Sequence, residues 1–231
     1  MEEGRENVGE KSSALEIDVY SDVICPWCFV GKRRLEWAIA QWDRAVPVKI
    51  SWRPFQLNPT MPQQGMGRRQ YLEAKFGGPG AAQAIYDQVA KAGAEEGIPF
   101  AFERIARTPN TFAAHRLIWM AGRHGKQDAI VETLFREYFL EGRDIGNLET
   151  LSRAAAQAGL ERTVIEPFLA GDEGMEAVKA EEAAGHRLGI RAVPYFVING
   201  THALSGAQPP ERFLAAFRQI KAGSVVGKAG A

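Results

Sequence analysis

The feature that most constrains this chain is the pair Cys25 and Cys28, the only cysteines among its 231 residues. Residues 15–22, which precede them, alternate apolar and polar side chains, and this alternation predicts a strand. Helical periodicity follows the pair, and Pro26 suits a first helical turn, because its missing N–H would have no partner there. The pattern therefore predicts a strand that runs directly into a Cys-x-x-Cys sequence at the start of a helix.

The residues after this motif predict a strand–helix–strand unit. Apolar residues recur at spacings of three, four and seven up to about Asp43, as one face of a helix requires. Residues 48–52 alternate again, which predicts a second strand. A crossover of this length makes the two strands parallel and the connection right-handed.

The chain changes character between residues 66 and 185, where it becomes rich in alanine and has few strand candidates. Thr108 is expected to be the N-cap, and Pro109 the first residue, of a helix that runs to about His124. Further helices are predicted at 126–140, 147–159 and 172–188. The segment is too long to be a loop, so we expect it to pack as a helical layer of its own.

A strand signal returns at residues 195–198. Asn199 and Gly200 are typical of a two-residue hairpin turn, which returns the chain as a strand over 201–204. A last helix is predicted to about Lys221.

The predicted organisation is therefore an α/β domain interrupted by an all-α insertion. Its α/β part has a βαβ half and a ββα half. The expected boundaries are a disordered leader at 1–13, the α/β domain at 14–65 and 186–222, the insertion at 66–185 and a flexible tail at 223–231.

Charge and targeting signals narrow the function classes. The chain has 28 basic and 28 acidic residues, so it lacks the basic surplus expected of a nucleic-acid binder or a polybasic membrane-surface protein. We see no signal-peptide pattern and no apolar run approaching the roughly 18 residues of a membrane span. The prediction is a cytoplasmic protein, and in that compartment paired cysteines are usually redox-active or metal-bound.

A Cys-x-x-Cys sequence at a helix start has a specific chemical consequence. The free N–H groups and the positive end of the helix dipole converge on Cys25 and favour its thiolate. Cys28 lies one turn further on, so it can attack a mixed disulfide formed at Cys25. Two alternatives are a structural disulfide and a zinc-stabilised binding module. A zinc site needs further ligands, but there is no second cysteine pair and no close spacing among the histidines, which are His115, His124, His186 and His202.

Several segments carry a resemblance to a known family. Residues 20–36 read YSDVICPWCFVGKRRLE, which resembles the active-site signature of the DsbA-like thioredoxin-fold oxidoreductases, in the FrnE-like branch described as polyketide-biosynthesis dithiol–disulfide isomerases. Further similar segments are 52–59 (WRPFQLNP), Asn110-Thr111, His115-Arg116-Leu117, Val193-Pro194 and 205–211 (SGAQPPE). They occur in the expected order, and together the similarity spans about residues 15–220.

The resemblance implies a thioredoxin-like fold with a helical insertion, and a cis peptide bond between Val193 and Pro194 opposite Cys25. Backbone groups of Val193 would then be free to pair with an extended substrate peptide. It also implies a place for Asn110 and His115 in a cleft under the helical domain. For His115, a buried histidine satisfied by a hydrogen bond is the alternative, because its neighbours on the helix form an apolar stripe.

The implied activity is that of a thiol–disulfide oxidoreductase or dithiol–disulfide isomerase acting on protein substrates. Its redox partner would be thioredoxin or glutathione, and it would need no cofactor beyond its own dithiol, with glutathione as a candidate co-substrate. The Pro26-Trp27 dipeptide replaces the Pro-His of the periplasmic oxidants, which predicts a couple less oxidising than their value of about −120 mV. The alternative is a glutathione-dependent enzyme of the kappa transferase or 2-hydroxychromene-2-carboxylate isomerase type, which uses a serine-type group where Cys25 stands.

Two further predictions concern side chains near the motif. Trp27, Phe55 and Met61 are expected to form an apolar rim for unfolded substrates. The basic run 32–34 is expected to be a solvated helix face.

Overall fold

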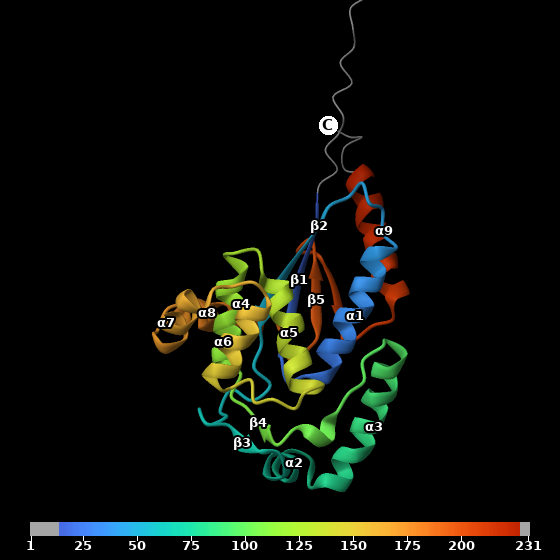
Figure 1. Ribbon diagram of the computed structural model, residues 1–231. Coiled ribbons are helices and arrows are strands. Elements are labelled where there is room, and N and C mark those ends of the chain that lie inside the picture. Colours follow the sequence, from blue (N-terminus) through green and yellow to red (C-terminus); the bar gives the residue numbers. More distant parts are fainter. Residues whose placement is uncertain (1–13, 227–231) are drawn as a thin grey trace, which may run out of the picture.

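The structure of the protein is a computed structural model, and it describes residues 14–226. The disordered leader predicted at 1–13 lies outside the described residues, as do the last five positions of the predicted tail. The α/β class with a helical insertion is confirmed. In Figure 1 the start of the sheet and the end of the last helix lie at the same end of the molecule.

A four-stranded sheet forms the centre of the α/β part. Its strands stand in the order β2-β1-β5-β6. The pair β1–β2, at one edge of the sheet, is parallel, with Ile17 opposite Ile50, and the other two pairs are antiparallel. The bounds are β1 Leu15–Ser21, β2 Val48–Pro54, β5 Tyr195–Ile198 and β6 His202–Ser205.

The hairpin turn predicted between the last two strands is confirmed. Asn199 and Gly200 both have positive φ, of 48° and 67°, which is the backbone twist that a tight two-residue hairpin needs. Asn199 also extends the pairing of β5 with β1. Its side-chain oxygen accepts from the Glu16 N–H at 2.8 Å, and its own N–H donates to the Glu16 carbonyl at 2.8 Å.

Two helices lie together on one side of the sheet (Figure 1). Most of the insertion helices lie on the other side, and the first two of the insertion lie beyond the end of the sheet. The pair consists of α1 Pro26–Ala40 and α9 Pro210–Val226, which extends beyond the predicted end near Lys221. The insertion contains α2 Arg68–Phe76, α3 Pro79–Glu95, α4 Phe112–Gly122, α5 Gln127–Phe139, α6 Leu148–Gln157, α7 Arg162–Ala170 and α8 Met175–Arg187.

The insertion differs from its prediction in two places. Thr108 is not a helix cap but belongs to a short strand, β4 Arg107–Thr108, which pairs with β3 Met66–Gly67. The helix begins three residues after Pro109, at Phe112. The helix α7 was not predicted, because Pro167 lies inside it and a proline interrupts the sequence signal of a helix.

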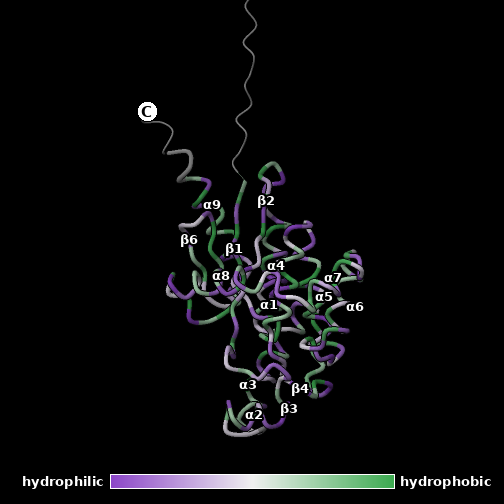
Figure 2. The backbone as a smooth tube through the Cα atoms, turned by 90° about the vertical axis from the view of Figure 1, so that its left-hand side faces the viewer, coloured by the Kyte–Doolittle hydropathy of each residue, from purple (hydrophilic) through white to green (hydrophobic). Residues whose placement is uncertain are grey.

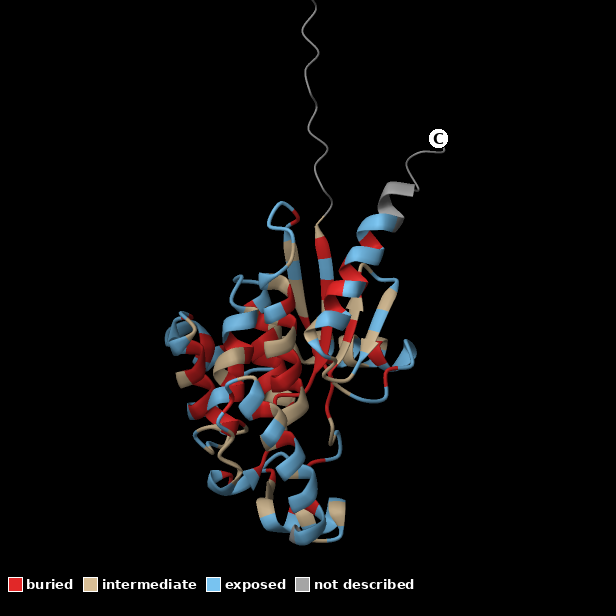
Figure 3. Cartoon of the chain, turned by 90° about the vertical axis from the view of Figure 1, so that its right-hand side faces the viewer, coloured by how far each residue is buried: buried red, intermediate tan, exposed pale blue. Residues whose placement is uncertain are grey.

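The core extends from the sheet into the insertion without a break. Buried residues concentrate along α4, α5 and α6, whereas α2 and α3 are largely exposed (Figure 3). The hydropathy view places α2 and α3 with β3 and β4 at the end of the molecule opposite to the end of α9 (Figure 2). Within the insertion, α4–α6 therefore carry most of the buried residues, and α4, α5 and α8 are the helices that contact β2 of the sheet.

Polar contacts fasten α5 to the free edge of β2. The Gln127 side chain accepts from the Trp52 N–H at 2.8 Å and donates to the Trp52 carbonyl at 3.1 Å, so it pairs as a neighbouring strand would. The Trp52 indole N–H donates to Asp128 at 3.0 Å. The edge strand is thus covered by the insertion rather than by another strand.

The prediction of a solvated face at 32–34 is wrong. Lys32 is 2% exposed, and its ammonium meets three carboxylates, those of Glu36, Asp128 and Glu132. Arg34 donates to Glu96 at 2.6 Å and to the Ala207 carbonyl at 2.7 Å. These cations therefore tie α1 to the rest of the protein. Most of their partners lie 60 or more residues away, out of reach of a local pattern.

Candidate active site

The site begins where β1 ends and α1 starts. Cys25 is the N-cap of α1 with extended φ and ψ of −92° and 110°, and Pro26 follows in the first turn. The Cys25 N–H donates to the Asp22 carbonyl at 3.0 Å, and the Cys28 N–H donates to the Cys25 carbonyl at 3.0 Å. The tight turn thus places Cys25 at the helix N-terminus, where unpaired N–H groups gather.

The two thiols are close together and shielded from solvent. Cys25 is 5% exposed and Cys28 is 1% exposed. The two side chains lie 3.4 Å apart, well beyond the roughly 2.05 Å of a disulfide bond, so this is the dithiol form. Cys25, the more exposed of the two, is the cysteine that an outside disulfide meets first.

The two cysteines have different electrostatic surroundings. Burial raises the pKa of the Cys28 thiol well above its usual range, and the neighbouring Cys25 raises it further. Interactions with the Ser21 hydroxyl and the Asp22 N–H act in the opposite direction but are smaller. Cys28 is thus held as a neutral thiol in the dithiol form.

A loop from the C-terminal half faces the dithiol. The peptide bond between Val193 and Pro194 is cis. The Cys25 thiol donates to the Val193 carbonyl at 3.6 Å, and the Pro194 carbonyl accepts from the Gly206 N–H at 2.8 Å. Of the two predicted substrate-binding residues, Val193 therefore contacts Cys25, and Pro194 follows it in the same loop.

The helix α1 can approach this loop closely only because Gly31 has no side chain. A Cβ at that position would lie 3.0 Å from Pro194 Cγ and 3.2 Å from Phe196 Cζ. Phe196 is fully buried and Pro194 is buried, so neither ring has room to retreat. The position of the Val193–Pro194 loop against α1 depends on this glycine.

We expect Gly31→Ala to lower the free energy of unfolding by about 1–3 kcal/mol, the usual cost of overpacking. The matched control is Gly80→Ala in α3, where a Cβ would meet no atom within 4 Å. There the gain in helix propensity should leave stability equal or higher, by up to about 1 kcal/mol. Urea unfolding of both variants checks the prediction, and a stabilised Gly31→Ala protein would contradict it.

The two predicted cleft residues, Asn110 and His115, have different partners in the structure. The amide of Asn110 is used by backbone partners, since its Nδ2 donates to the Met61 carbonyl at 2.7 Å and its Oδ1 accepts from the Phe112 N–H at 2.9 Å. It joins the loop after β2 to the start of α4. His115 is 3% exposed, and its Nε2 lies 3.4 Å from Asp22 Oδ1.

Sequence reasoning missed Asp22 as a member of this site. The carboxylate is fully buried, its Oδ2 accepts from the Leu57 N–H at 2.8 Å, and its Oδ1 makes no hydrogen bond. In the sequence it marks only the end of the predicted strand at 15–22. The signal was a single acidic residue three positions before Cys25, next to apolar residues where the chain enters the core.

The predicted apolar rim is wrong for two of its three members. Phe55 and Met61 are only 6% and 8% exposed. Phe55 packs with Tyr20 and Ile190 in a small cluster of their own. Trp27 is partly exposed and packs against the main core, so it alone remains available at the surface beside the thiols.

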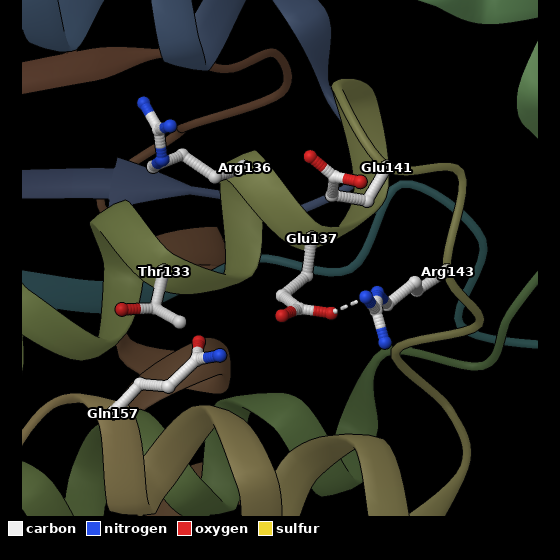
Figure 4. Close-up of a pocket in the computed structure, with 6 residues that line it drawn as sticks. All are labelled: Thr133, Arg136, Glu137, Glu141, Arg143 and Gln157. Carbon is white, nitrogen blue, oxygen red and sulfur yellow. Dashed lines mark ion pairs between the residues drawn. The ribbon is translucent and has the colours of Figure 1, made fainter.

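A separate polar cavity of about 340 Å³ lies where α5 meets α6 and the loop after α5 (Figure 4). Arg143 forms an ion pair with the buried Glu137 at 3.0 Å across it. Its lining consists of Thr133, Arg136, Glu137, Glu141, Arg143 and Gln157. None of these residues belongs to the dithiol site, and the charges of the two arginines and two glutamates balance.

Residues 14–226 offer neither a metal cluster nor a membrane-spanning helix. No group of three or more His, Cys, Asp or Glu side chains is arranged to hold a metal ion in this part of the chain. Within the same residues, no helix combines the length and the apolar character that crossing a bilayer requires.

A dithiol at a helix N-terminus, facing a proline loop across a βαβ and ββα sheet, defines a thioredoxin-like protein. A helical insertion between the βαβ half and the ββα half is found in only some thioredoxin-like proteins, so it narrows the choice of family. The chain belongs to the family of the DSBA-like thioredoxin domain, whose model matches residues 16–218.

Individual relatives agree with this family. The chain is 30% identical over 196 residues to the uncharacterized protein YwbO of Bacillus subtilis, covering 81% of this chain and 88% of YwbO. The crystal structure of a probable DsbA oxidoreductase, SCO1869 of Streptomyces coelicolor, is 32% identical, with a TM-score of 0.80 and 89% of each chain covered. The cytosolic disulfide reductase DsbM of Pseudomonas aeruginosa, solved with GSH, shares the fold at 19% identity, with a TM-score of 0.62 and coverage of 88% of this chain and 98% of DsbM.

Proposed function

We propose that the protein is a thiol–disulfide oxidoreductase or isomerase that works through Cys25 and Cys28. The observation that carries the proposal is the asymmetric dithiol. Cys25 caps a helix beside the Val193 carbonyl, whereas Cys28 lies 3.4 Å away, almost fully buried and with a raised pKa. That asymmetry gives the two sulfurs different tasks.

In the first step, the Cys25 thiolate attacks a substrate disulfide. A bond forms between Cys25 and one substrate sulfur, and the other substrate sulfur leaves as a thiolate that takes a proton from solvent. In the second step, Cys28 loses its proton and attacks the Cys25 sulfur, which releases the second substrate thiol and leaves a Cys25–Cys28 disulfide. The substrate gains two electrons and the protein loses two. Isomerisation results when a substrate thiol resolves the mixed disulfide instead.

Substrate binding in this proposal uses backbone groups. An extended peptide pairs with the backbone of Val193 as an added strand, and the partly exposed Trp27 supplies apolar contact beside Cys25. Glutathione or thioredoxin serves as the redox partner. The similarity to a disulfide reductase solved with GSH supports glutathione as the small thiol to test first.

The proposal also places the protein in the FrnE-like branch and in the cytoplasm. The branch rests on the matching segments around the dithiol and the proline loop. The compartment is proposed by analogy with the cytosolic disulfide reductase DsbM, whose fold the chain shares.

The test is insulin reduction by dithiothreitol, with Cys25→Ser as the variant. We expect the wild-type protein to accelerate reduction and Cys25→Ser to lose the acceleration completely, because no other thiol can start the exchange. Cys28→Ser should instead accumulate a mixed disulfide with substrate, which mass spectrometry detects. Equal activity in the wild-type and Cys25→Ser proteins would exclude the dithiol mechanism.

A further inference from the structure

A turn between β6 and α9 supports the proline loop of the site. The Gly206 N–H donates to the Pro194 carbonyl at 2.8 Å, and Gly206 has a φ of 80°, which glycine adopts without strain. Gln208 closes the turn, because its N–H donates to the Gly206 carbonyl at 2.8 Å and its side-chain amide donates to the Ser205 carbonyl at 2.7 Å. We call residues 205–208 the support turn.

One side chain fastens the support turn to the rest of the protein. Arg34 Nη1 donates to the Ala207 carbonyl at 2.7 Å. Among the described residues, no other side chain from outside the turn forms a hydrogen bond with it. Gly31 lies one helical turn before Arg34 and faces the Pro194 ring. The same face of α1 therefore contacts the proline loop and holds its support.

Arg34 is itself held by the insertion. Its Nε donates to the Glu96 carboxylate at 2.6 Å, and the two side chains are only 15% and 18% exposed. Glu96 is the residue at which α3 ends, and in Figure 1 this helix runs from the far end of the molecule back to α1. A charge-assisted bond of this kind is stronger than a neutral one, and the planar guanidinium keeps its two bonds in a fixed relation. The end of α3 thus determines where Arg34 places the support turn.

The position of the proline loop matters more for an extended peptide than for a small disulfide. A peptide that pairs with the Val193 backbone as an added strand needs donors and acceptors at fixed places. A small disulfide needs only access to the Cys25 sulfur. That sulfur is placed by the turn that begins α1, where the Cys25 N–H donates to the Asp22 carbonyl at 3.0 Å. A shift of the proline loop should therefore weaken peptide binding and leave the reactivity of Cys25 unchanged.

We propose that Arg34 is a positioning residue for substrate binding, which joins the support turn to the end of α3 and so holds the Val193–Pro194 loop in place for an extended peptide. This inference rests on the proposed function and deepens it. Binding of protein disulfides then depends on the insertion through one guanidinium, whereas reaction with a small disulfide does not.

The test compares a protein disulfide with a small one. Insulin with a quenched fluorescent label gives kcat and KM for reduction of a protein. Dithiobis(nitrobenzoate) reports the attack by Cys25, because that attack releases a coloured thiolate. The variants are Arg34→Met and Glu96→Gln, alone and combined. The matched control is Arg33→Met, because Arg33 is also partly buried and ion-paired, with carboxylates of α1 and α5, but forms no bond to the support turn in the described structure.

We expect Arg34→Met to raise the KM for insulin by about tenfold with kcat nearly unchanged, which corresponds to the loss of about one hydrogen bond to the peptide. Its rate with dithiobis(nitrobenzoate) should stay within about twofold of wild type. Glu96→Gln should raise the KM by only about threefold, because Arg34 keeps its bond to Ala207. The double variant should match Arg34→Met, since Glu96 acts through Arg34. Arg33→Met should match wild type with both disulfides.

A wild-type KM for insulin in Arg34→Met would overturn the inference. Equal slowing with both disulfides would overturn it too, because the variant would then disturb Cys25 or the whole fold. If Arg34→Met does not fold, Glu96→Gln and Arg33→Met carry the same comparison. If the wild-type protein reacts with neither disulfide, the proposed function itself fails. If it reacts with the small disulfide alone, protein substrates are excluded, and with them the role of Arg34 in binding them.

Discussion

Replacing Arg116 with methionine should lower the free energy of unfolding by about 3–4 kcal/mol. The side chain is 6% exposed, yet no carboxylate pairs with it at hydrogen-bond distance in the described structure. Its guanidinium instead donates to four carbonyl groups where α7 ends. These carbonyls belong to Phe168, Leu169, Gly171 and Glu173, at 2.6–3.5 Å.

The effect is large because a helix leaves its last carbonyls without internal partners. Arg116 satisfies those of α7 and places a positive charge at the negative end of its dipole. A methionine of similar length removes every donor. The carbonyls of the buried Phe168 and Leu169 are then left without a partner, at a cost of about 1–2 kcal/mol each. Those of the exposed Gly171 and Glu173 can bond to water instead. Arg116→Lys should lose less, because the ammonium keeps the charge and some of the bonds.

The matched control is Arg123→Met. Arg123 directly follows α4, the helix that contains Arg116. Arg123 is exposed and pairs with the Glu173 carboxylate at 2.8 Å, so its loss should cost less than about 1 kcal/mol. Urea unfolding of both variants measures the difference. If Arg116→Met were no less stable than Arg123→Met, the buried guanidinium would not be holding α7.

Arg116 also shows which residue roles cannot be predicted from the local sequence. It lies in a segment that resembles a known family, and the structure gives each conspicuous residue of that segment a task. Asn110 fastens the start of α4, His115 reaches the buried carboxylate, and Arg116 caps α7. Local sequence could not reveal these tasks, because Met61, Asp22 and Phe168, the partners that define them, each lie more than 45 residues away in the chain.

The parts of the fold that were predicted correctly are those that depend on short-range sequence patterns. Alternation placed β1 and β2, the proline placed the start of α1, and Asn199 with Gly200 placed the hairpin. The same reasoning failed at Thr108, because its backbone pairs with Met66 and not with a helix. A threonine before a proline is typical of a helix start. The local sequence does not show that a distant segment pairs with this threonine as a strand.

Asp22 is the part of the candidate site that could not be predicted from the sequence. The dithiol could be predicted because two cysteines three apart at a helix start have few other uses. A single carboxylate has many possible uses. Asp22 becomes a buried group of the site only because α4 and the Leu57 N–H pack against it in the folded protein. Tertiary contacts decided its role.

The dithiol form should lose stability as the pH rises above about 8.5, and Cys28 should be the cause. Burial raises the pKa of this thiol in the folded protein, so between the unfolded and folded values the folded state binds more protons than the unfolded state. Stability then falls with rising pH, by at most about 1.4 kcal/mol per pH unit for one group. The contribution is fully present below the unfolded value and is lost as the pH approaches the folded one.

The measurement is urea unfolding of the reduced protein over this range, compared with Cys28→Ala. The alanine leaves a small cavity that lowers stability equally at every pH, so only the slopes are compared. We expect the wild-type slope to be steeper above about pH 8.5. The disulfide form should match the variant, because it has no Cys28 proton to lose. Parallel slopes in the reduced wild type and Cys28→Ala would mean that folding does not hold the proton on Cys28.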